Sequence, residues 1–397
     1  MNKKKARYII IPFLTIIFGF FILNIIVPDK KYSIAENRNL EKKPTLKDIE
    51  DKEFASKFES YYNDQFVLRD EMISLNKKSE AKLNKTKVGN YYLVDNNWIL
   101  GMFPKLLSEE QLDDYSNTIN ELSEISSSLG KDVYYTMMPH KTNVLKHLYP
   151  KYIDNTGNID INKSEFRSRL ESDIVTYIDM DEYLLNNFSQ YELEKLYFKT
   201  DHHWTGIGAF ENFKMMASRM DLGISQDELD KHFARYRETT VKDKKFIGSY
   251  NQNLDMLVKE EEYVNYMYID NAKYTYELNG KSKKEEEIIA TSRNKKSWDY
   301  GGAYIRGAQT NILNIKNDKA LVDKKILIFR DSYQAPTTWL FADLFSEVEI
   351  VDPRNIDKID KTYEEIIKDS NSDIVMFMYN SSGFDSMVKA MIDKGIK

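Results

Sequence analysis

The stretch KKILIFRDSYQAPTTWL, residues 324–340, places an apolar run before a polar turn and a second apolar segment. The run KILIF at 325–329 predicts a short buried strand, and the segment from about 336 predicts a helix. The same order recurs at VEIV (348–351) before a helix from 362, and at IVMFMY (374–379) before a helix from 385. Short apolar strands separated by single helices predict an α/β fold, in which a parallel sheet is flanked by helices on both faces.

The elements upstream continue this pattern. VYYTMMP at 133–139 and IVTYIDM at 174–180 predict two further buried strands. KVGNYYLVDNNWILG at 87–101 predicts a hairpin with a turn near Asp95-Asn96-Asn97. Ser108 and Gln111 have the spacing of a capping box, which predicts that a helix begins there.

One segment breaks the alternation of strands and helices. EYVNYMYIDNAKYTYELNGKSKKEEE, residues 262–287, alternates with period two around Asp270-Asn271, and Asn279-Gly280 is a second tight-turn signal. We therefore expect an antiparallel β insertion here, with the charged KSKKEEE stretch as a solvated tip.

Ser332 follows the strand at 325–329 directly and stands a few residues before a helix. In a parallel sheet this position is the carboxyl edge of a strand, where functional sites collect. A serine there can expose its hydroxyl, and its own backbone N–H can serve an oxyanion. Serine is also an ordinary turn and cap residue, so this position alone does not establish a nucleophile.

The stretch YFKTDHHWTGIGAF, residues 197–210, holds two of the five histidines of the chain. Thr205 is a suitable N-cap for the helix that follows, so DHHW is expected in an extended turn before it. In extended chain, Asp201 and His203 project to the same side and His202 points elsewhere. A carboxylate that holds an imidazole in one tautomer forms the orienter-and-base part of a catalytic triad.

Two other interpretations of this stretch stay open on the residues alone. The same side chains could ligate a metal, or they could be ordinary packed polar groups. The remaining histidines, at 140, 147 and 232, are isolated in the sequence, and no H-E-x-x-H motif is present, so we expect no metal site. The absence of cysteine excludes thiolate metal sites, disulfides and thiol catalysis.

The N-terminus carries a membrane signal. YIIIPFLTIIFGFFILNIIV, residues 8–27, has no charge and is long enough to span a bilayer as a helix, and the basic MNKKKAR precedes it. The positive-inside rule then places everything after Val27 outside the cell. The run is long for a signal peptide and no small-x-small site follows it, which favours an uncleaved anchor. We expect a single-pass protein of the cell membrane with an extracellular C-terminal domain.

Composition and length suggest three parts. The chain has 397 residues, of which 42% are hydrophobic, so it can bury a sizeable core. Its net charge of −6 gives no basic surplus for binding nucleic acid. We expect a cytoplasmic tip and anchor at 1–27, a helical stalk or docking segment at 28–87, and one α/β domain at 88–397. Within the stalk, 52–62 and 70–85 have amphipathic helical patterns.

Several short motifs occur in a characteristic order along most of the chain after the apolar run. They are ENRNL (36–40), YYNDQFVLRD (61–70), NNWILG (96–101), MPHKTNVLKHLYP (138–150), DHHW (201–204), FIGSYNQN (246–253), YGGAYIRGAQTNILNI (300–315) and RDSY (330–333). In this order and spacing the chain resembles the DHHW family of bacterial cell-surface proteins. That family is similar to the SGNH-hydrolase-like domains of the alginate O-acetyltransferases.

The resemblance implies a catalytic triad. Position by position, it makes Asp201 the orienter, His203 the base and Ser332 the nucleophile. The chain order Asp, His, Ser is the reverse of the usual order in SGNH hydrolases. Triads are defined by geometry, so the order is no objection.

One position departs from the pattern of the SGNH block. Arg330 stands where the block usually has a glycine before Asp-Ser, and its side chain could narrow the approach to Ser332 or bind an anionic group. Gly301 and Gly302 are candidate backbone oxyanion donors, and Asn380, at the end of the last strand, is a candidate side-chain donor. All three are equally consistent with ordinary turn residues.

The resemblance also implies a function without a cofactor. It predicts a membrane-anchored, extracellular O-acetyltransferase that modifies a cell-surface or secreted polysaccharide, with a multispanning membrane acyltransferase as the source of the acyl group. Water as the acceptor would make the protein a carbohydrate esterase. The alternative from a different class is a carbohydrate-binding or scaffolding protein with a degenerate triad.

Overall fold

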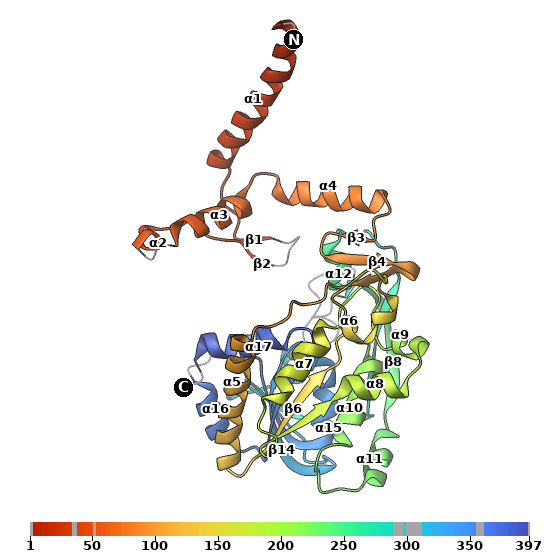
Figure 1. Ribbon diagram of the computed structural model, residues 1–397. Helices are drawn as coiled ribbons and strands as arrows, with labels where there is room; N and C mark the ends of the chain where they lie inside the picture. Colours follow the sequence, from red (N-terminus) through yellow and green to blue (C-terminus); the bar gives the residue numbers. More distant parts are fainter. Residues whose placement is uncertain are drawn as a thin grey trace. The chain divides into compact units, whose positions relative to one another are not determined.

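The structure is a computed structural model that describes residues 3–33, 38–50, 53–270, 272–288, 297–298, 312–354 and 361–395 (Figure 1). The chain divides into two compact units. The first contains Met1–Gly89 and Asn251–Val258, and the second contains Asn90–Tyr250 and Lys259–Lys397.

The first unit is mainly helical. Its elements are α1 (Lys3–Ile26), β1 (Tyr32–Ser33), β2 (Arg38–Asn39), α2 (Leu46–Glu50), α3 (Phe54–Gln65), α4 (Arg69–Lys82) and β3 (Lys87–Val88). Strands β1 and β2 pair antiparallel. Within α1, Arg7–Ile26 is the one stretch of the described chain that is long and apolar enough to cross a membrane. Helices α3 and α4 occupy the two segments for which the sequence predicts amphipathic helices.

The second unit is built on an eight-stranded sheet with the order β11-β10-β13-β15-β14-β16-β6-β7. The strands are β6 (Asp132–Met138), β7 (Val175–Asp179), β10 (Thr275–Leu278), β11 (Lys281–Lys283), β13 (Ile312–Lys316), β14 (Val322–Arg330), β15 (Phe345–Val351) and β16 (Ile374–Asn380). The five strands from β15 to β7 are parallel, as the alternation of strands and helices predicts. Strands β13, β10 and β11 extend one edge antiparallel, so the sheet is mixed.

Helices cover both faces of this sheet (Figure 1). On β14, Ile326 and Ile328 belong to one buried cluster, whereas Leu327 and Phe329 belong to the other, as expected when successive residues of a strand face opposite sides. The first cluster is completed by α8 (Met180–Asn187), α10 (Gly206–Ala217) and α15 (Thr338–Leu344). The second is completed by α5 (Glu109–Ser128), α7 (Asn158–Ser168), α16 (Tyr363–Asp369) and α17 (Phe384–Lys394).

The segment 262–287 does not form one insertion, because it divides between two sheets. Strand β9 (Glu262–Tyr268) pairs antiparallel with β8 (Arg237–Phe246), a strand that the sequence pattern did not indicate. The hairpin β10–β11 turns at Asn279-Gly280, where both residues have positive φ, and joins the main sheet instead. An isolated hairpin is only marginally stable, so each strand extends an available edge.

Shorter elements complete the second unit and its borders. They are β4 (Tyr91–Val94), η1 (Asp95–Asn97), β5 (Trp98–Leu100), α6 (Lys141–Val144), η2 (Lys146–Leu148), α9 (Gln190–Lys195), α11 (Gln226–Phe233), α12 (Ser249–Asn253), α13 (Glu285–Ile288), β12 (Ser297–Trp298) and η3 (Ala335–Thr337). Strands β4 and β5 form the predicted hairpin. The capping box of Ser108 and Gln111 and the N-cap at Thr205 are both present.

Candidate active site

Ser332 lies on the loop after β14, in the middle of the parallel part of the sheet. The Asp331 carboxylate fixes this loop, because it accepts hydrogen bonds from the backbone N–H of Tyr333 at 2.8 Å and from that of Asn380 at 2.8 Å. Asp331 and Tyr333 are buried, whereas Ser332 between them is half-buried. Ser332 is thus the least buried of the three residues, at the carboxyl edge of the sheet where the sequence pattern places it.

Asp201 and His203 lie on a tight loop before α10. The loop is closed by an antiparallel bridge between Tyr197 and Trp204, and by a hydrogen bond of 2.7 Å from the backbone N–H of Thr205 to the carbonyl of Leu196. The side chain of Thr205 then caps α10. The DHH tripeptide consequently occupies the tip of a short, closed turn between the bridge and the helix.

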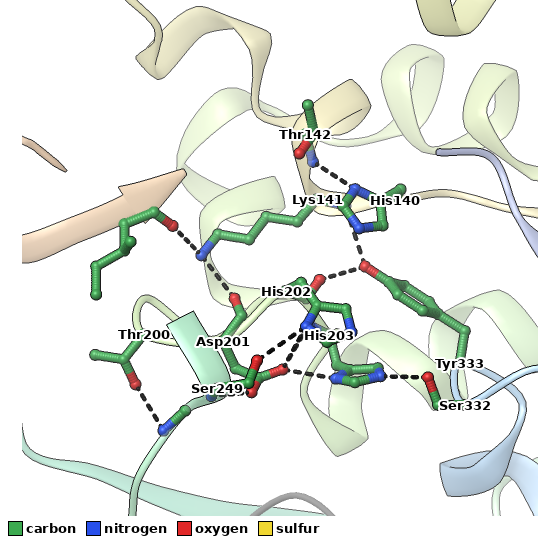
Figure 2. A network of polar contacts seen from close by, with 12 residues as sticks. His140, Lys141, Thr142, Thr200, Asp201, His202, His203, Ser249, Ser332 and Tyr333 are labelled. Carbon is green, nitrogen blue, oxygen red and sulfur yellow. Dashed lines mark hydrogen bonds and ion pairs between the residues drawn. The ribbon is translucent and has the colours of Figure 1, made fainter. Parts of the chain in front are cut away.

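Asp201, His203 and Ser332 form a continuous chain of hydrogen bonds (Figure 2). Oδ1 of Asp201 lies 2.6 Å from Nδ1 of His203, and Nε2 of His203 lies 2.8 Å from Oγ of Ser332. Asp201 also accepts a hydrogen bond of 3.0 Å from the backbone N–H of His203. With the carboxylate holding the proton on Nδ1, Nε2 is the acceptor for the serine proton.

The carboxylate of Asp201 is completely buried and ionised. Burial acts to raise its pKa, but the neighbouring rings of His202 and His203 and hydrogen bonds from His203 and the Ser249 backbone outweigh burial and hold the pKa well below the ordinary range. Oδ2 accepts the Ser249 N–H at 2.6 Å. A charged, fully hydrogen-bonded carboxylate at this position stabilises the imidazolium that forms when His203 takes a proton.

Gly248 allows the backbone of Ser249 to reach Asp201. A Cβ atom at position 248 would lie 2.1 Å from the carbonyl oxygen of Thr200. Any other residue type at this position would therefore push the backbone segments around Thr200 and Gly248 apart. The N–H of Gly248 also donates to the Thr200 hydroxyl at 3.2 Å. This close approach gives the FIGSYNQN segment a physical role in the site.

The side chain of Lys141 binds the backbone of the DHHW loop. Its ammonium group donates to the backbone carbonyls of Ile99 at 2.7 Å, Lys199 at 2.9 Å and Asp201 at 2.8 Å. The side chain is completely buried, and burial lowers its pKa to about 7 against the opposing effect of the Glu262 and Asp201 carboxylates. No local pattern singles out this residue, because the partners of its ammonium group come from two distant segments.

His140 also lies in the site, which corrects the expectation that it is isolated. Its ring is 5.3 Å from that of Tyr333 and 6.0 Å from that of His202, measured between centroids. Nδ1 accepts the Thr142 N–H at 3.1 Å, so the neutral ring carries its proton on Nε2. Burial holds the pKa of His140 well below its ordinary value, so the ring is neutral near pH 7.

Arg330 does not stand in front of Ser332. Its side chain is 1% exposed, pairs with Asp352 at 3.6 Å and donates to the carbonyl of Asp331 at 3.2 Å. The guanidinium therefore stabilises the base of the loop from inside the protein. In this location the side chain of Arg330 does not narrow the approach to Ser332.

The candidate oxyanion donors are less well placed. The side-chain amide of Asn380 donates to Asp331 at 2.6 Å, so one of its two N–H groups serves the loop rather than a substrate. Gly301 and Gly302 lie outside the described residues. The backbone N–H of Ser332 itself remains the donor that the sequence analysis proposed first.

Asp201, His202 and His203 are the one group of three potential metal ligands in the part of the chain that the structure describes. One ligand atom from each lies within 4.8 Å of the others. These atoms already have protein partners, since His203 bonds Asp201 and Ser332, and Nδ1 of His202 lies 3.1 Å from the Ser249 hydroxyl. Burial lowers the pKa of His202 to about 3, which keeps its ring neutral.

A mixed sheet flanked by helices, with a strand-end serine bonded to an Asp-x-His pair, defines the SGNH-hydrolase-like class of proteins. Within that class, the chain belongs to the family described as SGNH hydrolase-like domain, acetyltransferase AlgX, whose family model matches residues 102–310. The match includes Asp201 and His203 and ends before Ser332. The resemblance that the short motifs indicated is thereby confirmed.

Solved structures share this fold. PatB1 of Bacillus cereus, determined with a sulfonyl adduct, is 22% identical with a TM-score of 0.63, and the similarity covers 75% of this chain and 97% of that chain. A DHHW family protein from Eubacterium siraeum is 18% identical with a TM-score of 0.60, covering 76% of this chain and 94% of that chain. Comparison with curated proteins gave no match.

Proposed function

We propose that this protein is a membrane-anchored, extracellular O-acyltransferase that acetylates hydroxyl groups of a polysaccharide. Ser332 is the nucleophile, His203 the general base and Asp201 the orienter. The observation that carries the proposal is the chain of two hydrogen bonds, 2.6 Å from Asp201 to His203 and 2.8 Å from His203 to Ser332. Ser332, at one end of this chain, is half-buried, and Asp201, at the other end, is buried.

The first half-reaction forms an acyl-enzyme. Nε2 of His203 takes the hydroxyl proton of Ser332 while Oγ attacks the carbonyl carbon of the donor ester. The backbone N–H of Ser332 stabilises the negative oxygen of the tetrahedral intermediate. The intermediate collapses with loss of the donor alcohol, which leaves with the proton from His203. An acetyl ester on Oγ and a neutral imidazole remain.

The second half-reaction transfers the acetyl group. A sugar hydroxyl gives its proton to Nε2 of His203 and attacks the acetyl carbonyl, and Oγ of Ser332 leaves and takes that proton back. The products are an O-acetylated sugar and the free enzyme. Water in place of the sugar would release acetate, so the same residues would act as an esterase.

The proposed substrates and location follow from the family and from the N-terminal helix. Membership in the AlgX acetyltransferase family supports acetyl transfer to a polysaccharide. Helix α1 is long and apolar enough to anchor the chain, and the basic residues before it favour a cytoplasmic N-terminus. An extracellular domain has no supply of cytoplasmic acetyl-CoA, so we propose that a multispanning membrane acyltransferase delivers the acyl group.

The test uses the full chain in detergent with p-nitrophenyl acetate as the donor. We expect release of p-nitrophenol, an acetyl adduct on Ser332 detected by peptide mass spectrometry, and the same residue modified by a sulfonyl fluoride. Ser332→Ala should lower the rate by about 10⁴-fold, in the range found when a triad member is removed. Adding oligosaccharides should divert the acetyl group from water to sugar if the protein is a transferase.

A matched control is Ser346→Ala, because Ser346 lies near the start of β15, at the opposite end of the parallel strands from Ser332. This variant should keep the parent rate. Equal rates for Ser332→Ala and the parent, with no adduct on Ser332, would overturn the proposed nucleophile and favour the carbohydrate-binding alternative.

A further inference from the structure

Helix α3 carries a row of exposed aromatic rings. Phe54, Phe58 and Tyr62 recur at every fourth residue and expose 38%, 48% and 42% of their surface. The ring centroids of successive members lie 5.9 and 6.3 Å apart, and Phe66, just after the helix, continues the row at 5.9 Å from Tyr62. We call these four residues the aromatic stripe. A contiguous exposed apolar row of this kind marks an interaction surface.

Polar side chains, rather than this stripe, attach α3 to the rest of the first unit. Gln65 binds the backbone of Lys30, Asp64 accepts the N–H of Glu41, Lys57 pairs with Asp48, and the hydroxyl of Tyr61 bonds Asp29. The helix is therefore held in place by its polar faces. On its aromatic face, Phe66 contacts Phe20 of α1, whereas Phe54, Phe58 and Tyr62 stay exposed.

The stripe is continuous with the apolar surface of α1. The ring of Phe66 stacks on that of Phe20 at 5.5 Å with an interplanar angle of 13°. The backbone N–H of Val67 donates to the side chain of Asn24 at 2.7 Å. Phe20 lies six residues, or about 9 Å along the helix, before the end of the apolar run. If α1 spans the bilayer, this end of the stripe consequently lies at the depth of the outer membrane boundary.

The contact between Asn24 and Val67 has the chemistry that such a depth requires. A backbone N–H near hydrocarbon must find a partner within the protein, because no water is available there. Asn24 provides that partner from within the apolar helix. The pair thus satisfies one polar group of each segment at the place where α3 joins α1 (Figure 1).

An apolar crevice of about 480 Å³ lies between the end of α1 and α3. Phe21 and Ile25 line it from α1, and Phe58 and Tyr62 line it from the stripe. Lys43 contributes a cationic side chain to the same lining. The carboxylate of Asp29 lies in the same lining, where it offsets the charge of Lys43 and accepts a hydrogen bond from the hydroxyl of Tyr61. The apolar walls therefore match the acyl chain of a lipid rather than its phosphate.

We propose that α3 is an interfacial helix whose aromatic stripe inserts into the outer surface of the bilayer that α1 crosses. Phe54, Phe58 and Tyr62 then lie at the boundary of headgroups and acyl chains, about 5–10 Å deep, where aromatic rings are enriched. The occupant of the stripe is lipid. This inference rests on the membrane anchor of the proposed function, and it adds a second attachment that fixes the rotation of the first unit on the membrane surface.

The test exploits the absence of cysteine from the chain. The full chain with Phe54→Cys, Phe58→Cys or Tyr62→Cys is labelled with an environment-sensitive fluorophore and reconstituted into phosphatidylcholine vesicles that carry nitroxides either near the headgroup or at the end of the acyl chain. Matched controls are Ser56→Cys and Ser60→Cys, which lie on the opposite face of α3 because they are two residues from Phe58. Phe18→Cys, in the middle of the apolar run, reports on the anchor.

We expect shallow nitroxides to quench the three stripe labels at least about two-fold more than the two controls, and deep nitroxides to quench the Phe18 label most. A quenched Phe18 label with equal, weak quenching on both faces of α3 would overturn the interfacial helix while leaving the anchor intact. An unquenched Phe18 label would overturn the anchor and this inference together. The three stripe positions give independent readings, so one poorly folded variant does not decide the outcome.

Discussion

The loop Tyr197–Trp204 and the segment Pro139–Thr142 both contribute to the candidate active site, but in different ways. Within the loop, Asp201 and His203 bond each other across two positions of sequence. Within the other segment, Lys141 bonds residues that are 42, 60 and 192 positions away. Local spacing therefore points to the groups that we propose to react, whereas the groups that hold them are recognisable only in the folded chain.

Disruption of the two segments should also differ in whether it mainly lowers activity or folding stability. In the proposed mechanism the Asp201–His203 pair carries the proton path, so its disruption should remove activity and leave the fold intact. Lys141 satisfies three buried carbonyls, so its removal should cost folding free energy first and activity second. Separate measurements of activity and unfolding can therefore distinguish the roles of the two segments.

The largest effect is expected for Asp201→Asn. An asparagine amide favours the wrong tautomer of His203, with the proton on Nε2, so the imidazole can no longer accept the proton of Ser332. We expect kcat for p-nitrophenyl acetate to fall by about 10⁴-fold, while the midpoint of urea unfolding shifts little. Steady-state kinetics and circular dichroism measure the two quantities on the same preparation.

Asp173→Asn is the control for this prediction, since Asp173 is exposed and outside the site. It should keep both the rate and the unfolding midpoint of the parent. A fully active Asp201→Asn variant would show that Asp201 is a packing residue and would remove the loop from the proposed mechanism.

The next effect is expected for Lys141→Met, which keeps the length of the side chain and removes its donors. The carbonyls of Ile99, Lys199 and Asp201 each lose a hydrogen bond, although that of Lys199 keeps the one from the Ile99 N–H. The free energy of unfolding should therefore fall by about 3 kcal/mol. Because one of these carbonyls belongs to Asp201, kcat should fall at temperatures where the variant remains folded. Urea unfolding and kinetics on the full chain measure the two changes.

Lys163→Met gives the matched comparison. Lys163 is buried and pairs with Asp179 and Asp181, away from Ser332. It should lose stability to a similar extent and keep the kcat of the parent while folded. Equal effects of the two variants on kcat would mean that Lys141 has only a structural role.

A smaller effect concerns the pH dependence of folding stability, to which both His202 of the loop and His140 of the other segment contribute. Burial lowers the pKa of both rings, that of His202 to about 3. The unfolded chain binds protons at about 6.5, so below that pH it binds more protons than the folded chain. Stability is thus fully present above about pH 6.5 and is lost as the pH falls toward 3. Because His202 is partly exposed, its share is about 1 kcal/mol between neutral pH and pH 5.

Urea unfolding at those two pH values measures the loss. His202→Asn should reduce the difference in unfolding free energy between them, because the ring that resists protonation is gone. His147→Asn, at the surface beside Glu194, should not reduce it. A pH dependence that is identical in the parent and His202→Asn would contradict the prediction.

Much of the fold follows from local pattern, and the misses have physical causes. The strands at 325–329 and 374–379 and the capping box at Ser108 are local features, and the structure has them where the sequence predicts them. The antiparallel edge of the sheet was missed, because the choice of partner for a period-two strand depends on which edges are open. The two sheets that divide 262–287 show the same limit.

The site shows the same division. The family resemblance implied that Asp201, His203 and Ser332 act together, and the structure brings their side chains within hydrogen-bonding distance, while their catalytic roles stay a prediction. His140 and Lys141 were not predicted, because the polarity of a histidine or lysine does not reveal that its partners lie up to 241 residues away. Arg330 was a candidate to narrow the approach to Ser332 or to bind an anionic group. Only the fold reveals that its guanidinium pairs with Asp352 inside the protein.

The smallest expected effect comes from metal removal, and it tests the loop itself. Asp201, His202 and His203 offer three ligand atoms within 4.8 Å, so a metal could bind there in principle. Binding would require His203 to give up Asp201 or Ser332, because both of its nitrogens already have partners. We therefore expect dialysis against EDTA to leave the hydrolysis of p-nitrophenyl acetate unchanged, and excess Zn²⁺ to inhibit it by occupying the imidazole. Loss of activity in EDTA that Zn²⁺ restores would instead make the three residues a metal site and assign the chemistry to a metal-bound water.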